Sequence, residues 1–211
     1  MRILHSMDEF DGPGCVVALG TFDGVHLGHA RLIKRAVGLA RKWRLPAAAL
    51  TFDRHPLALI RPDAVPAPLT SRAEKARLLA ELGVDILVEE TFTEAFAAQT
   101  PEEYLARVCR ALRPCAVVAG YNHTFGRYGR GNAALLEALG RKLGYEPVIV
   151  EAVCVDNEPV SSSRIRALLT AGRLAEAERL AGHPLCQNEN ILSPEQKFST
   201  KTDLQASQGM L

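Results

Sequence analysis

Short apolar runs alternate along the chain with longer stretches in which apolar residues recur at helical spacing. Runs of this length and composition are typical of strands that are buried on both faces. We expect such strands at residues 16–19, 47–52, 84–88, 115–119 and 147–155. Because strands and helices alternate, the pattern predicts an α/β domain built from parallel βαβ units rather than an all-β fold.

Helices are expected between these strands, where capping residues and breakers mark their ends. Ser71 with Glu74 three residues later matches a capping-box pattern, and Thr100 precedes a proline at the first helical position. The predicted helices span residues 30–44, 71–82, 93–98, 100–112, 133–143, 161–171 and 175–181. A proline-rich segment at residues 61–70 is expected to form an irregular loop, and residues 156–159 are expected to form a turn.

The stretch at residues 16–36 has the pattern of a strand, a turn and a helix. Such a turn directs unpaired backbone N–H groups and the positive end of a helix dipole at one point, which suits a phosphate group. Two histidines, His26 and His29, lie there, and a spacing of three residues places both on one helical face. Closely spaced glycines, which favour a backbone approached by a ligand, surround the pair: Gly20, Gly24 and Gly28.

Other interpretations of this histidine pair remain open on the residues alone. His-x-x-His can bind a metal, although no third ligand stands at a suitable spacing nearby. Two solvated histidines at a helix start are a further alternative. The stretch is neither a Walker loop nor the Gly-x-Gly-x-x-Gly fingerprint. A phosphate or nucleotide site is the interpretation that the residues favour.

Composition narrows the class of protein. Apolar residues make up 47% of the 211 residues and charged residues 23%, which is ordinary for a globular domain, and the net charge of +1 gives no reason to expect nucleic acid or a membrane surface as a partner. The five cysteines form no Cys-x-x-Cys pair, and no apolar run reaches membrane length, so we expect a cytoplasmic protein. The polar, aperiodic C-terminus predicts one domain over residues 1–184 and a flexible tail at 185–211.

The ten residues from Gly20 to His29 resemble a known signature. The segment His26-Leu-Gly-His29 is similar to the His-x-Gly-His mark of the nucleotidyltransferase superfamily. The longer form, Gly-Thr-Phe-Asp-Gly-Val-His-Leu-Gly-His, resembles the FMN adenylyltransferase module of bacterial FAD synthetases. This resemblance implies a Rossmann-like, doubly wound parallel sheet of the nucleotidyltransferase type.

A second segment, from Ser161 to Arg166, combines three serines with two arginines. A serine run at a helix start is an ordinary N-cap, yet hydroxyls, free N–H groups and guanidinium groups together suit a pyrophosphate. The segment is similar to the Ile-Ser-Ser-Thr-x-Ile-Arg signature of the same family, with Val160 for the first Ile and Ser163 for Thr. The resemblance implies that Ser162, Ser163 and Arg166 hold the triphosphate, with Arg164 beside them.

Two further segments resemble elements that contact the flavin in the same family. Residues 120–126 resemble the Gly-x-Asn/Asp-x-x-Phe-Gly segment, although an ordinary glycine-rich loop is the alternative. Here the resemblance implies that Asn122 contacts the nucleotide, and that the flavin side is shaped by Tyr121, Phe125 and Arg127. Residues 51–56 resemble a Phe-x-Pro-His-Pro element, which implies flavin contacts by Phe52, Asp53, His55 and Pro56. Arg54 replaces the first proline of that element, so a fixed backbone angle is lost.

The resemblance implies ATP-dependent adenylylation of FMN, which yields FAD and pyrophosphate, with Mg²⁺ held mainly by the ATP phosphates. His26, His29 and Arg166 are the implied catalytic residues, and further nucleotide contacts are implied for Gly20, Phe22, Asp23 and Gly28. Transfer to another phosphorylated acceptor and an inactive flavin- or nucleotide-binding module are the alternatives. The Pro-Thr-Ala-Asn mark of a riboflavin kinase domain does not follow Pro184, so the resemblance covers one module of two. A separate riboflavin kinase is one candidate partner, and self-association stays open.

Overall fold

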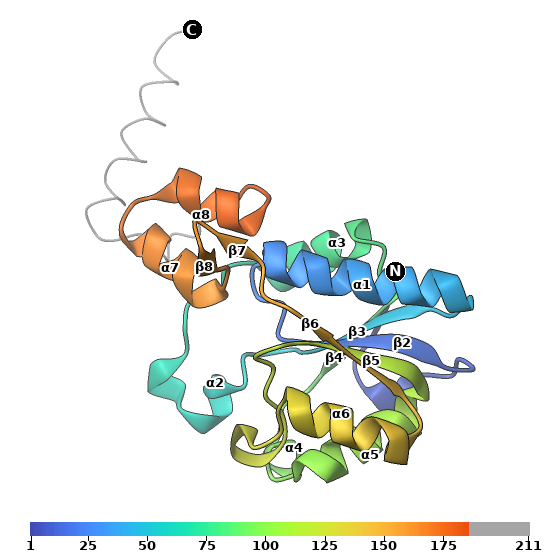
Figure 1. Ribbon diagram of the computed structural model, residues 1–211. Coiled ribbons are helices and arrows are strands. Elements are labelled where there is room, and N and C mark those ends of the chain that lie inside the picture. Colours follow the sequence, from blue (N-terminus) through green and yellow to red (C-terminus); the bar gives the residue numbers. More distant parts are fainter. Residues whose placement is uncertain (186–211) are drawn as a thin grey trace, which may run out of the picture.

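The computed structural model describes residues 1–185, and its centre is a six-stranded sheet in the order β1-β4-β3-β2-β5-β6 (Figure 1). Every neighbouring pair in this sheet is parallel. The strands are β1 (Arg2–Leu4), β2 (Cys15–Leu19), β3 (Ala47–Phe52), β4 (Ile86–Glu90), β5 (Pro114–Gly120) and β6 (Glu146–Val150). The prediction of an α/β fold with a parallel sheet is confirmed.

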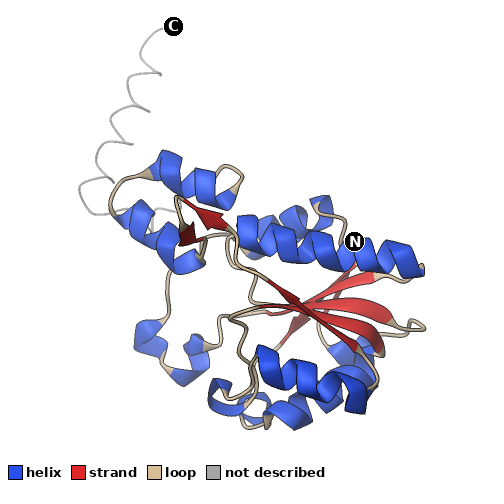
Figure 2. Ribbon diagram, viewed as in Figure 1, coloured by secondary structure: helices blue, strands red, loops and turns tan. Residues whose placement is uncertain are grey.

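Helices cover both faces of the sheet (Figure 2). On one face lie α1 (Leu27–Trp43) and α3 (Arg72–Glu81), and on the other lie α5 (Pro101–Leu112) and α6 (Ala133–Leu143). The chain therefore runs outward from β2 to β3 and β4, and then crosses to the other side of β2 to form β5 and β6. This is a doubly wound sheet, and its strand order reverses between β2 and β5, where such folds place their ligands.

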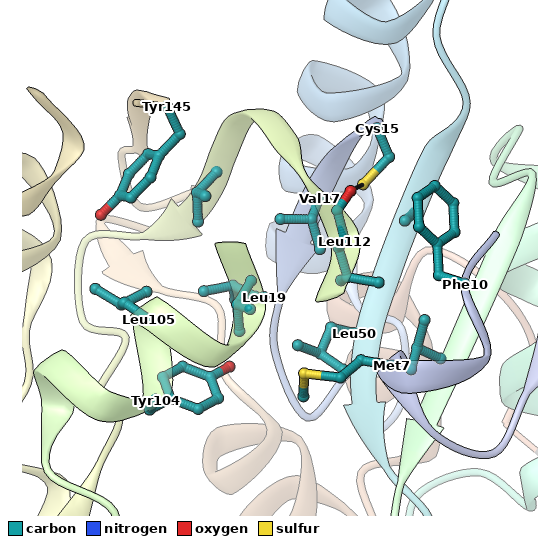
Figure 3. Close-up of a cluster of buried hydrophobic side chains, with 14 of the residues drawn as sticks. Met7, Phe10, Cys15, Val17, Leu19, Leu50, Tyr104, Leu105, Leu112 and Tyr145 are labelled. Carbon is teal, nitrogen blue, oxygen red and sulfur yellow. Dashed lines mark hydrogen bonds between the residues drawn. The ribbon is translucent and has the colours of Figure 1, made fainter. Parts of the chain in front are cut away.

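Two hydrophobic cores, one on each face, explain the continuous apolar runs of the sequence. Val16 and Ala18 of β2 contribute to the core beneath α1 and α3. Val17 and Leu19 point to the opposite core, which α5 and α6 close with Tyr104, Leu105, Leu112 and Leu136 (Figure 3). A central strand in such a sheet buries both of its faces, so it shows no polar alternation.

A smaller unit follows the sheet and packs near the start of α1 (Figure 1). It consists of the hairpin β7 (Cys154–Val155) and β8 (Glu158–Pro159), followed by α7 (Ser162–Thr170) and α8 (Leu174–Ala181). Its own core includes Val160, Ile165 and Leu180. Leu185 also packs there, whereas the rest of the predicted tail lies outside the described residues.

Several boundaries differ from the sequence-based expectations. The strand expected at residues 147–155 ends at Val150, because residues 151–153 leave the sheet and lead into the hairpin. The edge strand β1 was not predicted, since three residues carry no recognisable pattern. The first helix begins at Leu27 instead of residue 30. Short elements complete the chain: η1 (Met7–Glu9), α2 (Leu57–Ile60), η2 (Pro62–Ala64), α4 (Glu94–Ala97) and η3 (Arg127–Gly129).

The two predicted helix caps also have different outcomes. Thr100 and Glu103 form a complete capping box at the start of α5. At α3, Ser71 accepts a hydrogen bond from the backbone N–H of Glu74 at 3.1 Å, but the Glu74 carboxylate pairs with Arg77. The expected reciprocal bond is therefore missing there, because a neighbouring guanidinium group competes for the carboxylate.

Candidate active site

A cavity of about 500 Å³ opens at the carboxyl ends of the central strands. Its wall includes Gly20 after β2, Gly120 at the end of β5 and Val150 at the end of β6. It thus lies at the point where the strand order reverses. Further lining residues come from α1 and α7, from α4, α5 and the loop after β5, and from the end of β3 with the segment that leads into α2.

The turn between β2 and α1 lies at the polar end of the cavity, the end that His26 and His29 line. Its backbone is unusual. Phe22 has φ +50° and Val25 has φ +34°, values in the left-handed region that side chains other than glycine seldom adopt. Both side chains are buried, with exposures of 0% and 3%, so packing holds the turn in this conformation. Strained backbone that the surroundings hold in place is concentrated at functional sites.

The two histidines are locked together at the start of α1. His26 is the N-cap, and its Nδ1 accepts a hydrogen bond from the backbone N–H of His29 at 3.3 Å. The two rings stack with centroids 3.7 Å apart. Because Nδ1 of His26 accepts, the proton of its neutral ring belongs on Nε2, which is thereby available as a donor.

Gly28 lies between the histidines because no side chain would fit there. A Cβ atom at this position would lie 3.1 Å from Cε1 and 3.2 Å from Nδ1 of His26. It would also lie 3.8 Å from the carbonyl oxygen of Val160, directly before α7. The start of α7 therefore approaches the start of α1, and two helix N-termini face one region of the cavity.

Burial keeps both histidines neutral at pH 7. Desolvation lowers the pKa of His26 to about 4. Burial lowers the pKa of His29 well below its ordinary value, and electrostatic repulsion from His26 and Lys75 lowers it further. Nδ1 of His29 is buried and has no hydrogen-bond partner among the described residues. Neutral imidazoles act here as hydrogen-bond donors and acceptors rather than as permanent cations.

The serine segment lies where the sequence placed it, at the start of α7. Ser161 is the N-cap and accepts a hydrogen bond from the backbone N–H of Arg164 at 3.2 Å. All three serines, Ser161, Ser162 and Ser163, line the cavity. The Ser162 hydroxyl donates to the carbonyl oxygen of Asp23 at 2.9 Å, which ties α7 to the turn after β2. Ser161 therefore has the role of an ordinary N-cap, and the serine segment also lines the cavity.

The two arginines of the same segment do not line the cavity. Arg166 forms a hydrogen-bonded ion pair with Asp23 and also donates to the carbonyl oxygen of Ala67 at 2.8 Å. Asp23 in turn accepts from the backbone N–H of Leu69 at 2.9 Å. Arg164 instead donates to the carbonyl oxygens of Val155 and Glu158 in the β7–β8 hairpin. In this structure both arginines connect segments that surround the site.

Aromatic side chains form the other end of the cavity. Phe96 of α4 packs edge-on against Phe52 at the end of β3, with centroids 5.3 Å apart, and lies 5.7 Å from Tyr104 of α5. Tyr104 in turn lies 5.7 Å from Phe125 in the loop after β5. With Phe92, these rings line one continuous wall. Such a wall suits a flat aromatic ligand.

Twelve of the predicted site residues line this cavity: Gly20, His26, Gly28, His29, Phe52, His55, Pro56, Tyr121, Asn122, Phe125, Ser162 and Ser163. Six others do not: Phe22, Asp23, Asp53, Arg127, Arg164 and Arg166. Phe22 packs behind His29 at 5.4 Å, and Arg127 lies exposed over the ring of Tyr128. Asp53 and Arg54 line a neighbouring cavity of about 320 Å³ that shares Phe52, His55 and Pro56 with the first.

Sequence reasoning missed several lining residues: Ile60, Phe92, Phe96, Tyr104 and His123. Phe96 and Tyr104 carry an apolar helical pattern that is typical of any core, and only the fold brings them to the cavity. Within residues 1–185, no group of three or more His, Cys, Asp or Glu side chains is arranged to hold a metal ion.

A doubly wound sheet with two helix N-termini at one cavity is the arrangement of α/β proteins of the nucleotide-binding class, in which helix starts suit phosphate groups. Comparison with known proteins is more specific. Residues 9–164 match the family model described as FAD synthetase. The chain belongs to the FAD synthetase family.

Individual relatives agree with this family. The bifunctional riboflavin kinase/FMN adenylyltransferase of Escherichia coli (strain K12) is 33% identical over 193 residues, which are 91% of this chain and 62% of that protein. An FAD synthetase of Listeria monocytogenes is 34% identical over 175 residues, 82% of this chain and 71% of that protein. The chain thus spans somewhat less than two thirds of the length of the E. coli protein.

A solved structure shares the fold. It is described as a macrolide-efflux protein from Streptococcus pneumoniae, and it superposes with a TM-score of 0.75 at 30% identity over 87% of this chain and 60% of that one. For this chain, none of the helices within residues 1–185 is long and apolar enough to cross a membrane.

Proposed function

We propose that the chain transfers the adenylyl group of ATP to the phosphate of FMN, so that FAD and pyrophosphate are formed. The observation that carries this proposal is one cavity with two chemically different ends, a polar end at two helix starts and an aromatic end. A flavin joined to a nucleotide through phosphates needs both. The names of the E. coli and Listeria relatives support the same chemistry.

In the proposed reaction, an oxygen of the FMN phosphate attacks the α-phosphorus of ATP. The new P–O bond forms as the bond between the α-phosphorus and the bridging oxygen breaks, and pyrophosphate leaves with that electron pair. A phosphate monoester loses its second proton near pH 6, so the nucleophile is already ionised at neutral pH. No strong general base is required, which is consistent with the low pKa values of both histidines.

Catalysis then depends on positioning and on stabilising the charge of the transferred group. We assign hydrogen-bond donation to Nε2 of His26, whose other nitrogen is held by the backbone of His29. We assign His29 to the same group, since it stacks on His26 at 3.7 Å. Ser163 and the free N–H groups at the starts of α1 and α7 complete the proposed phosphate site.

The proposed roles of Mg²⁺ and Arg166 follow from charge. A Mg²⁺ ion on the ATP phosphates would supply counter-charge when bound, and we propose that the phosphates hold it. Arg166 already has Asp23 as its partner, so its proposed contact with the triphosphate requires the phosphate to share or replace that carboxylate. Asp23 and Arg164 are proposed to act near the nucleotide through the segments they connect.

The remaining proposals concern the setting of the reaction. We propose that nucleotides and flavin are the small-molecule partners, that nucleic acid and membranes are not partners, and that the chain acts in the cytoplasm. A riboflavin kinase, on a separate chain or on a further module, would supply the FMN.

The experiment that tests this function incubates the purified chain with FMN, ATP and Mg²⁺ and follows FAD and pyrophosphate by chromatography. Formation of both in equal amounts is the expected result. Pyrophosphate release with another phosphorylated acceptor, but not with FMN, would show that this acceptor and not FMN is the substrate. Binding of FMN and ATP without turnover would instead indicate an inactive binding module.

A further inference from the structure

His123 is a histidine of the cavity wall to which neither the resemblance nor the proposed reaction gives a role. It stands in the loop after β5, between Asn122 and Thr124, and its backbone N–H donates to the carbonyl oxygen of Gly120 at 3.0 Å. Nε2 of the ring is buried and has no hydrogen-bond partner among residues 1–185. Nδ1 makes no hydrogen bond to the described residues either. Nδ1 is not one of the buried unpaired atoms, so it is the ring nitrogen that a molecule in the cavity can reach.

The ring belongs to the aromatic end of the cavity and not to the phosphate end. It stacks on Phe125, with centroids 5.9 Å apart and planes at 23°, and Phe125 continues the wall toward Tyr104. The preceding residue turns the other way, because Oδ1 of Asn122 lies over Gly120 on the side of Leu32 in α1. Asn122 thus lies toward α1, and His123 is a polar group beside the aromatic wall.

The protonation of the ring follows from its burial. Desolvation lowers the pKa of His123 to about 4, so the imidazole is neutral at pH 7 and carries one N–H group. A proton on Nε2 would be a buried donor with no acceptor among the described residues, which is unfavourable. A proton on Nδ1 places the donor on the nitrogen that is not fully buried, where a bound ligand can accept it, and leaves Nε2 unprotonated.

We propose that His123 is a specificity-determining residue that donates a hydrogen bond from Nδ1 to a nitrogen or carbonyl oxygen of the isoalloxazine ring. The inference rests on the proposed function, because it takes FMN as the ligand of the aromatic end. The isoalloxazine ring has acceptors on one edge and an apolar dimethylbenzene part on the other. A stacking wall with an imidazole donor beside it favours one orientation of such a ring, and this donor discriminates against flat ligands that lack the acceptor.

The first test uses the wild-type chain labelled with ¹⁵N in its histidine rings, with the His123 signals assigned through its backbone resonances. The expected ring is neutral with its proton on Nδ1, and the Nδ1 resonance shifts when FMN is added and not when ATP is added. A proton on Nε2, a response to ATP alone, or no response to FMN at saturation would each overturn the inference.

The second test compares two substitutions by FMN binding, followed through flavin fluorescence. His123→Phe keeps a flat ring and removes the donor, and loss of one hydrogen bond predicts a Kd for FMN that rises roughly 3- to 10-fold. His123→Asn places an amide donor near the position of Nδ1, and its Kd is expected to stay closer to wild type than that of the Phe variant. His5→Phe, at an exposed histidine whose side chain makes no hydrogen bond, is the control. Equal FMN affinity in wild type and His123→Phe would contradict the inference.

Neither test uses turnover, so this inference and the proposed function can fail separately. A chain that binds FMN through His123 but forms no FAD would overturn only the proposed reaction. A chain that forms FAD with an unresponsive His123 would overturn only the inference.

Discussion

The two ends of the cavity are built in different ways. The polar end comes from two short stretches, residues 20–29 and 160–163, in which a helix start supplies both the backbone N–H groups and the side chains. The aromatic end collects single rings from β3, α4, α5 and two loops. A site that depends on a local backbone conformation uses consecutive residues, so the sequence can indicate it. A wall of packed rings forms only when folding brings distant residues together.

The largest expected effect concerns the polar end. His29→Ala removes a half-buried imidazole that stacks on His26, and loss of one preorganised hydrogen-bond donor predicts a fall in kcat of about 10²- to 10³-fold. The fold should persist, since the variant also removes a buried nitrogen without a partner. Steady-state FAD formation together with circular dichroism measures both, and His5→Ala is the control. Turnover within threefold of wild type would remove His29 from the catalytic group.

The pH dependence of stability tests one histidine at each end of the cavity, His26 at the polar end and His123 at the aromatic end. The pKa of His26 and that of His123 are each about 4 in the folded chain, against 6.5 as the ordinary value. Between pH 6.5 and 4 the unfolded chain binds more protons, so the free energy of unfolding falls as the pH falls, by at most about 1.4 kcal/mol per pH unit for each histidine. Above pH 6.5 this contribution is complete.

Chemical denaturation at pH 7, 6 and 5 measures this slope. His123→Phe removes one histidine at the aromatic end and is expected to give a shallower slope than wild type. Identical slopes in the two chains would show that His123 titrates normally in the folded state.

A smaller effect tests the close approach at Gly28. The Cβ of Gly28→Ala would lie 3.1 Å from the His26 ring, so the ring must shift, and we expect kcat/KM for ATP to fall about 10-fold while FMN affinity is unchanged. Gly38→Ala, in the same helix with nothing within 4 Å of the new Cβ, is the matched control. It should leave activity unchanged and raise the free energy of unfolding by about 0.5–1 kcal/mol. An equal loss of activity in both variants would contradict the local explanation.

The smallest effect is expected at the aromatic end. Phe96→Leu removes edge-on contacts with Phe52 and Tyr104, and the loss of aromatic packing predicts a Kd for FMN that rises roughly 2- to 10-fold, with ATP affinity unchanged. Phe10→Leu is the control, because Phe10 belongs to the same core with the same 7% exposure but does not line the cavity. Comparable FMN affinity in the two variants would show that the aromatic wall does not bind the flavin.

The same contrast explains what the sequence could predict. The helix at residues 133–143 and the strand at residues 47–52 were predicted with their observed bounds, because a glycine directly after the helix and an apolar run mark them locally. His26, Gly28 and Ser162 were placed at one site because each follows a strand-end or helix-start pattern.

The contacts of Arg166 could not be predicted in this way. Its ion pair with Asp23 joins residues 143 positions apart, and nothing local to either residue indicates it. Phe96 and Tyr104 were expected in helices but not at the site, since their spacing is typical of a helix face that packs on any core. The strand at Glu146–Val150 was predicted too long because the apolar run continues to Val155 after the sheet has ended.

The central claim is that the polar end binds the nucleotide phosphates and the aromatic end binds the flavin. The most direct measurement is a crystal structure of the chain with FAD bound. The account predicts the diphosphate at the starts of α1 and α7, within hydrogen-bond distance of His26, and the isoalloxazine ring against Phe125 and Phe96. An isoalloxazine ring at the histidines, or FAD bound outside this cavity, would contradict it.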